Sequence, residues 1–109
     1  MTDPIVELAK IRLAKGKTEA DLLAASDQFQ KDFLDAQDGF IRRELVREPS
    51  GDYIDIIHWE SQAHADAVGA KIETSEDIGA YFSLMDFDPE AEDAMPVFHQ
   101  SLQVHSAKP

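Results

Sequence analysis

The sequence predicts an α+β domain of the ferredoxin-like βαββαβ order, with a four-stranded antiparallel sheet and helices on one face. Three observations predict it: apolar residues alternate in four segments, recur at helical spacing in the segments between them, and are separated by turn residues. A length of 109 residues is typical of one domain. We therefore expect a single domain over residues 1–109, with its core over about residues 5–104.

The first predicted strand, residues 5–13, alternates Ile11 and Leu13 with charged side chains. A Lys-Gly-Lys turn follows it. Thr18 has an acid three positions later, which is the pattern of a capping box at a helix start. Apolar residues at helical spacing then predict an amphipathic helix over about residues 19–35.

The second and third predicted strands, residues 40–48 and 53–59, are joined by a Pro-Ser-Gly-Asp turn and form a hairpin. The third strand is apolar on both faces, because Ile56 points to one side and Ile57 and Trp59 to the other. A strand of this kind should be covered on both sides. Since the helices cover one face, we expect the other face to pair with a second copy in a homodimer.

Ser61 is a good N-cap for a second helix over residues 62–71. A further helical segment is expected over residues 76–85, where Ile78, Tyr81, Phe82 and Met85 share one side. An acidic loop then leads to the last predicted strand, residues 96–104.

Composition narrows the classes of function. Acids outnumber bases by 22 to 10, which gives a formal charge of −12 and repels phosphate backbones and anionic lipid, so we expect no nucleic-acid or membrane partner. The chain has no Cys, which removes disulfides and thiolate chemistry. The first residues show no signal-peptide pattern, and no apolar run is long enough to span a membrane, so the expected location is cytoplasmic.

The chain resembles the antibiotic biosynthesis monooxygenase (ABM) family of dimeric α+β barrel proteins. The resemblance covers about residues 5–104. It rests on Asp38-Gly39-Phe40 at the opening of the second strand and on the apolar run that ends the third strand in Trp59-Glu60-Ser61. It also rests on the Ala- and His-containing helix that follows and on Phe98-His99 in the last strand. It implies a barrel made of two sheets and a pocket between each sheet and its helices. Members include cofactor-independent oxygenases of aromatic polyketides, haem-degrading enzymes and small proteins of unassigned role.

The resemblance does not extend to haem degradation. That branch uses an Asn in the first strand, a Trp in the second helix and a His about three turns later. This sequence has no Asn, and Val68 and Ile78 stand near the positions of the expected Trp and His. We therefore expect no haem and no other cofactor.

The leading hypothesis is a homodimer that binds an apolar or aromatic small molecule between sheet and helices, as a cofactor-independent monooxygenase. His58 would be the base or orienting donor, since histidine titrates near neutrality. Trp59, Tyr81, Phe82 and His99 would line the substrate site. Each residue also has a plain structural interpretation, with Trp59 packing a helix on the sheet and His58 in the core or an interface. The alternatives are a non-enzymatic ligand-binding or stress-related module, and a structural dimer without a catalytic site.

No metal site is predicted. Zinc would need His58, His64 and His99 to converge, which their spacing does not indicate. The alternating acids of residues 86–92 fail the calcium-loop pattern, because Ala91 replaces its Gly and Val97 replaces its last Glu.

Overall fold

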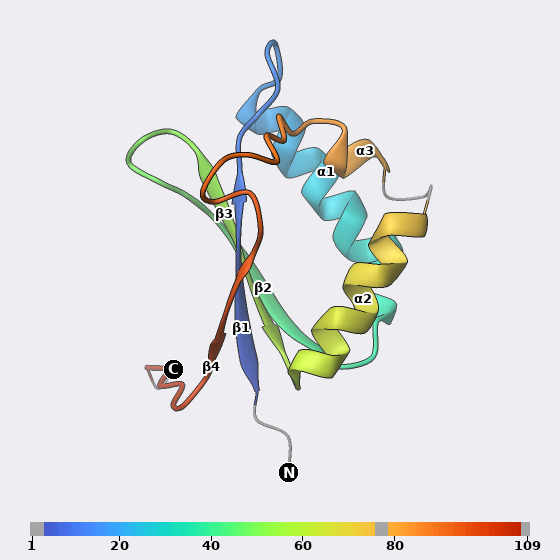
Figure 1. The fold of residues 1–109 in the computed structure, drawn as a ribbon, viewed down its shortest axis with the longest axis vertical. Helices are drawn as coiled ribbons and strands as arrows, with labels where there is room; N and C mark the ends of the chain where they lie inside the picture. The colour runs from blue at the N-terminus through green and yellow to red at the C-terminus, as the bar shows by residue number, and fades with distance from the viewer. Residues whose placement is uncertain (1–3, 76–78, 108–109) are drawn as a thin grey trace.

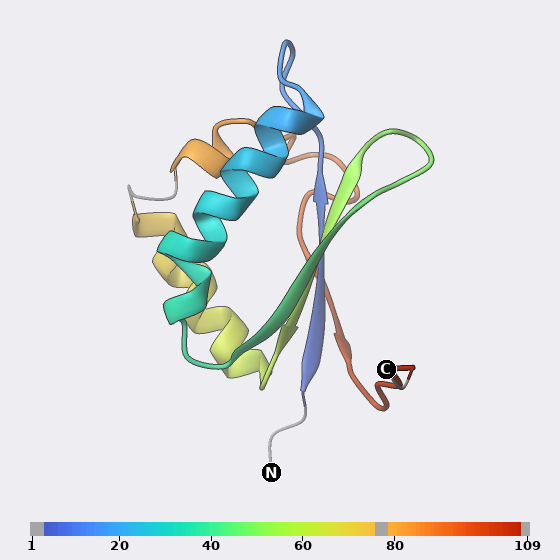
Figure 2. The same ribbon diagram turned by 180° about the vertical axis from the view of Figure 1, so that it is seen from behind.

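The computed structural model describes residues 4–75 and 79–107. Four antiparallel strands form one sheet, as predicted, and they lie in the order β2-β3-β1-β4. Their bounds are β1 Ile5–Ile11, β2 Phe40–Arg47, β3 Tyr53–Trp59 and β4 Val97–Gln100. The helices all lie on one face of this sheet (Figures 1 and 2). They are α1 Glu19–Asp32, the short 3₁₀ helix η1 Leu34–Ala36, α2 Gln62–Thr74 and α3 Gly79–Phe82.

The start of α1 confirms the predicted capping box. The Asp21 amide donates to Thr18 Oγ1 at 3.2 Å, and the Thr18 amide donates to Asp21 Oδ2 at 3.0 Å. The helix ends at Asp32, before the predicted residue 35, because Phe33 leaves the helical region with φ −131°. The chain then continues as η1.

The first strand ends before its predicted boundary. β1 stops at Ile11, and Leu13 instead forms an isolated bridge with Met85. The last strand is also shorter than predicted, because its residue Gln100 already pairs with Ile5, the first residue of β1. Both strands end where the partner strand ends. The local sequence pattern does not show how long the partner strand is, so it does not predict these boundaries.

Ser61 caps α2 as predicted, and its Oγ accepts from the His64 amide at 3.2 Å. The helix runs on to Thr74, one turn beyond the prediction, through the exposed Gly69. The first three residues of the predicted segment 76–85 lie outside the described residues, and α3 begins at Gly79. No helix in residues 4–75 and 79–107 is long and apolar enough to cross a membrane.

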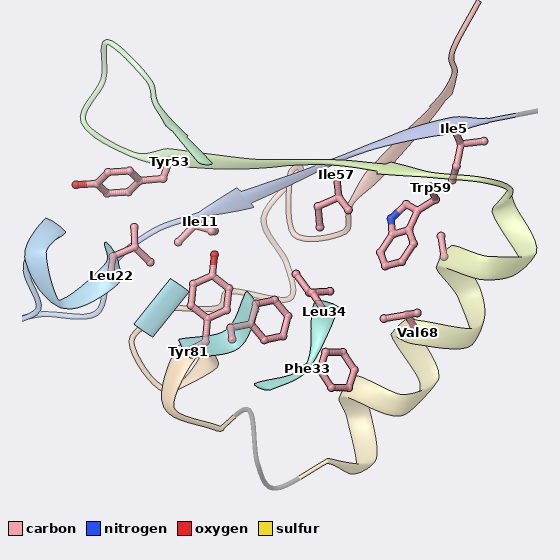
Figure 3. Packing of buried hydrophobic residues seen from close by; sticks show 12 residues of the cluster. Ile5, Ile11, Leu22, Phe33, Leu34, Tyr53, Ile57, Trp59, Val68 and Tyr81 are labelled. Atoms are coloured by element: carbon pink, nitrogen blue, oxygen red, sulfur yellow. The ribbon is translucent and has the colours of Figure 1, made fainter. Parts of the chain in front are cut away.

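The core fills the layer between sheet and helices. Figure 3 shows Trp59 and Ile57 pointing from β3 toward the helices, where Val68 of α2 and Leu34 face them. Tyr81 lies on α3, with its hydroxyl directed toward the sheet. The alternation of β3 therefore places odd-numbered residues in this layer and even-numbered residues on the open face.

Apolar side chains also occupy the open face of the sheet. Val6 and Leu8 of β1 lie beside His58 and Ile56 of β3, and no helix among the described residues covers them. All four are only half-buried. This apolar open face is the feature from which the sequence predicted a partner.

Candidate functional site

A cavity of about 790 Å³ lies between the sheet and the helices. Its apolar wall comes from every layer around it: Phe29 of α1, Leu34 of η1, Ile57 of β3, Val68 of α2 and Phe82 of α3. The volume is within the range of small-molecule sites, and a mostly apolar lining is typical of them.

Glu7 is a charged residue that lines this cavity at a position where the strand pattern predicts an apolar side chain. It points from β1 into the helix side, between Ile5 and Ala9, where an apolar residue is expected. The Trp59 indole Nε1 donates to Glu7 Oε1 at 2.9 Å and holds the carboxylate in place. Burial raises the pKa of Glu7, the Trp59 hydrogen bond opposes that rise, and the Asp55 charge adds to it.

Beside the cavity lies a buried polar cluster of Arg43, Asp55 and Tyr81. The Arg43 Nε atom donates to Asp55 Oδ1 at 2.9 Å, and both side chains are only 6% exposed. The Tyr81 hydroxyl donates to Asp55 Oδ2 at 2.6 Å, and Arg43 Nη2 donates to the Tyr81 oxygen at 3.0 Å. The cluster therefore joins β2, β3 and α3.

Further contacts satisfy the rest of the Arg43 guanidinium. It donates to Gln30 Oε1 at 3.2 Å and to Ser26 on α1, and it lies 5.4 Å and 5.3 Å from the ring centroids of Phe29 and Tyr81. Burial is the largest influence on Arg43 and disfavours its charge, but the charges and hydrogen bonds of Asp55 and Tyr81 together outweigh burial and raise the pKa of Arg43. Burial, followed by the Asp55 charge, also raises the pKa of Tyr81, so its hydroxyl keeps its proton.

The family model described as antibiotic biosynthesis monooxygenase matches residues 4–69, which is more than half of the chain. The chain belongs to the antibiotic biosynthesis monooxygenase family. The matched region runs from the start of β1 into α2, so it contains Glu7, the Arg43–Asp55 pair and Trp59. No curated protein matches the chain significantly.

Solved structures share the fold of this ABM protein. SnoaB, a cofactor-independent oxygenase from Streptomyces nogalater, is 16% identical with a TM-score of 0.69, over 94% of this chain and 97% of SnoaB. A protein from Bordetella bronchiseptica named for the same family is 21% identical with a TM-score of 0.68, over 95% and 100% of the two chains. A haem-degrading protein from Mycobacterium tuberculosis is 16% identical with a TM-score of 0.62, over 98% and 100%. At these identities the likeness shows the fold alone.

The predicted site residues divide between the two faces of the sheet. Trp59 and Tyr81 lie on the helix side and are each 2% exposed, whereas Phe82 lines the cavity at 38% exposure. His58 and His99 lie on the open face, because both are paired with Val6. One pocket between sheet and helices therefore cannot hold all five.

His58 has surroundings that keep it neutral. Its partial burial, together with the charge of Arg42 beside it on β2, lowers the pKa of His58. Trp59, predicted as a stacking wall, is among the residues that line the cavity. Its indole packs against Phe40, with ring centroids 5.7 Å apart, and its Nε1 atom donates to Glu7.

A metal-capable group of side chains does occur elsewhere, at the start of α2. Asp38, Glu60 and His64 bring their ligand atoms within 4.8 Å of one another. The carboxylate side chains are 93% and 60% exposed, and His64 Nδ1 is engaged with Ser61 Oγ at 2.7 Å.

Sequence reasoning missed Glu7 and Asp55, and it favoured an exposed, salt-bridged position for Arg43 over a place in a pocket. The signal was present for two of them, since Glu7 and Asp55 fall on the helix-facing side of strands whose neighbours on that side are apolar. A carboxylate at such a position needs a partner or a function. Arg43 gave a weaker signal, because the bulge between Phe40 and Arg42 shifts the alternation of β2.

Proposed function

We propose that this protein is a cofactor-independent monooxygenase of an apolar or aromatic small molecule that binds between sheet and helices. The observation that carries the proposal is the 790 Å³ cavity with the Trp59-held carboxylate of Glu7 inside it. Membership of the ABM family and the fold shared with an oxygenase support the same chemistry.

Glu7 is the proposed proton acceptor, in place of His58. Its carboxylate would take a proton from an acidic C–H or O–H of the bound ring, and the resulting carbanion would give one electron to O₂. Recombination of the carbon radical with superoxide would form a C–O bond and a peroxide anion, and protonated Glu7 would return its proton to give the hydroperoxide. For a ring CH₂ group, loss of water then leaves a ketone, so one O₂ yields one product oxygen and one water.

The other parts of the site have supporting roles in this proposal. Trp59 positions Glu7 through its indole hydrogen bond. Phe29 and Phe82 provide aromatic surface for the substrate ring. The apolar wall would exclude water from the carbanion, which would otherwise be reprotonated.

Oxygen uptake by the pure protein tests the proposal. We expect consumption of O₂ with aerated anthrones or hydroquinones in chelator-treated buffer, above the rate without protein. Tight binding of the same compounds without uptake would contradict the enzyme and leave the ligand-binding alternative. Neither binding nor uptake would leave the structural dimer.

We also propose that the apolar open face joins two copies. We expect the protein to sediment at micromolar concentration with about twice the monomer mass of 12.2 kDa. Ile56→Lys, at the centre of that face, is expected to give a monomer, because it places a charge where the copies meet. Leu23→Lys is the matched control, since Leu23 lies 51% exposed on α1. A wild-type protein that sediments as a 12.2 kDa species would contradict the dimer.

A further inference from the structure

The cavity carries an unbalanced charge. Of the described residues that line it, seven are Asp or Glu, and two of these acids are already paired with cations, Asp55 with Arg43 and Asp93 with Arg12. The basic residues in the lining are Lys10 and Arg12. Both basic groups already have acidic partners: Lys10 Nζ lies 2.5 Å from Glu48 Oε1, and Arg12 Nη2 lies 2.7 Å from Asp93 Oδ2. Within residues 4–75 and 79–107, the lining therefore offers no uncommitted cation to a ligand.

The acids occupy two depths. Glu7 lies inside, against Trp59. Glu73 on the last turn of α2, and Asp86 and Asp88 in the loop after α3, are exposed and come to the cavity from its rim. Asp88 accepts from the Glu90 amide at 3.0 Å, and this neutral donor does not cancel the negative charge of the carboxylate.

The interior between these acids is apolar and aromatic. Phe29 and Phe82 meet edge to face with their centroids 5.6 Å apart, and both line the cavity. A flat ring fits such walls, and a positive group gains from aromatic faces as well as from carboxylates. The lining thus matches a ligand with an aromatic body and a positive group at one end.

We propose that the cavity selects aromatic ligands that carry a positive charge, such as aryl-alkyl amines, over anionic aromatic ligands of the same size. The ring lies among the apolar walls, and the ammonium group lies at the rim near Asp86 and Asp88. This inference rests on the proposed function for the use of the cavity, and it adds the class of substrate. A carboxylate or sulfonate on the same ring would meet like charges without a free cation to neutralise it.

Three matched probes test the proposal: 2-(2-naphthyl)ethylamine, 2-(2-naphthyl)ethanol and 3-(2-naphthyl)propanoate. Binding to the wild-type protein is measured by calorimetry at pH 7 in low and high salt. We expect the amine to bind about 5- to 10-fold more tightly than the alcohol, and the carboxylate more weakly than the alcohol by a similar factor, as expected for one partly solvated ion pair. The differences in affinity among the three probes should become smaller at about 0.5 M salt, because exposed rim charges are screened.

Two double variants that each remove two negative charges test whether the preference for the amine comes from the rim. Asp86→Asn with Asp88→Asn removes two rim charges, and the amide introduced at position 88 keeps an oxygen that can accept from the Glu90 amide. Asp27→Asn with Asp32→Asn removes two exposed charges from α1, away from the cavity. We expect the rim variant to lower the amine-to-alcohol affinity ratio about threefold or more, and the α1 variant to leave the ratio unchanged.

The outcomes separate the two proposals. Failure of both the amine and the neutral alcohol to bind would overturn the use of the cavity, and with it the proposed function. Binding of the alcohol with an equal or greater affinity for the carboxylate would overturn the charge selection alone. An equal fall of the ratio in both double variants would also overturn it, because the preference would then come from the net charge of −12 rather than from the rim.

Discussion

Asp55→Ala is expected to destabilise the fold by about 3–5 kcal/mol, the usual cost of leaving a buried charge without its partner. Asp55 is 4% exposed, and its two oxygens accept from Arg43 and Tyr81. Without it, a buried guanidinium keeps its charge and a buried hydroxyl loses its acceptor. Urea unfolding at a fixed protein concentration measures the loss as a fall in the midpoint.

A graded series keeps this prediction testable even if the alanine variant is too unstable to purify. Tyr81→Phe removes the hydrogen bonds of the Tyr81 hydroxyl with Asp55 and with Arg43 but leaves the Arg43–Asp55 ion pair, and it should cost about 1–3 kcal/mol, less than Asp55→Ala. Combining Asp55→Ala with Arg43→Met should cost less than the sum of the single changes, because the second change removes the unpaired charge. Asp27→Ala, at an exposed position on α1, is the control and should have little effect. A loss of less than about 1 kcal/mol for Asp55→Ala would show that the buried pair is not needed.

The fold was predictable because its information is local. Thr18 and Ser61 cap the helices at which they were expected, since a cap depends on residues three positions apart. The alternation of β3 correctly separated Ile56 from Ile57 and Trp59. Boundaries were less well predicted where a partner decides them, as where β4 ends opposite the first residue of β1.

The candidate site was predicted less well because its contacts are distant in sequence. Asp55 meets Tyr81, which is 26 positions later, and Glu7 meets Trp59, 52 positions away. Strand alternation shows which face a side chain occupies but not what lies opposite. It already separated His58 from Trp59, so the prediction of both in one pocket conflicted with the pattern of the strand itself.

Glu7→Gln is expected to lower oxygen uptake by about 10²- to 10⁴-fold, the usual contribution of a general base. The amide keeps an oxygen that can accept from the Trp59 indole, so the geometry of the cavity should persist. Initial rates at saturating substrate measure the effect. Glu92→Gln is the matched control, because this carboxylate is exposed and does not line the cavity. Loss of activity in His58→Ala with none in Glu7→Gln would return the role to His58.

The pH dependence separates a catalytic Glu7 from a structural one. Since the pKa of Glu7 is raised in the fold, its favourable contribution to stability is present at low pH and is lost as the pH rises through the raised pKa. At neutral pH the ionised carboxylate therefore opposes folding, and Glu7→Gln should unfold at higher urea than the wild type, with the difference fading in acid. Activity depends on the same charge in the opposite direction, so the wild-type rate should fall on the acidic side at a pH above 4.5, the ordinary value for glutamate. A variant that gains stability while losing turnover would mark Glu7 as a group kept for chemistry, because packing alone would favour the neutral side chain.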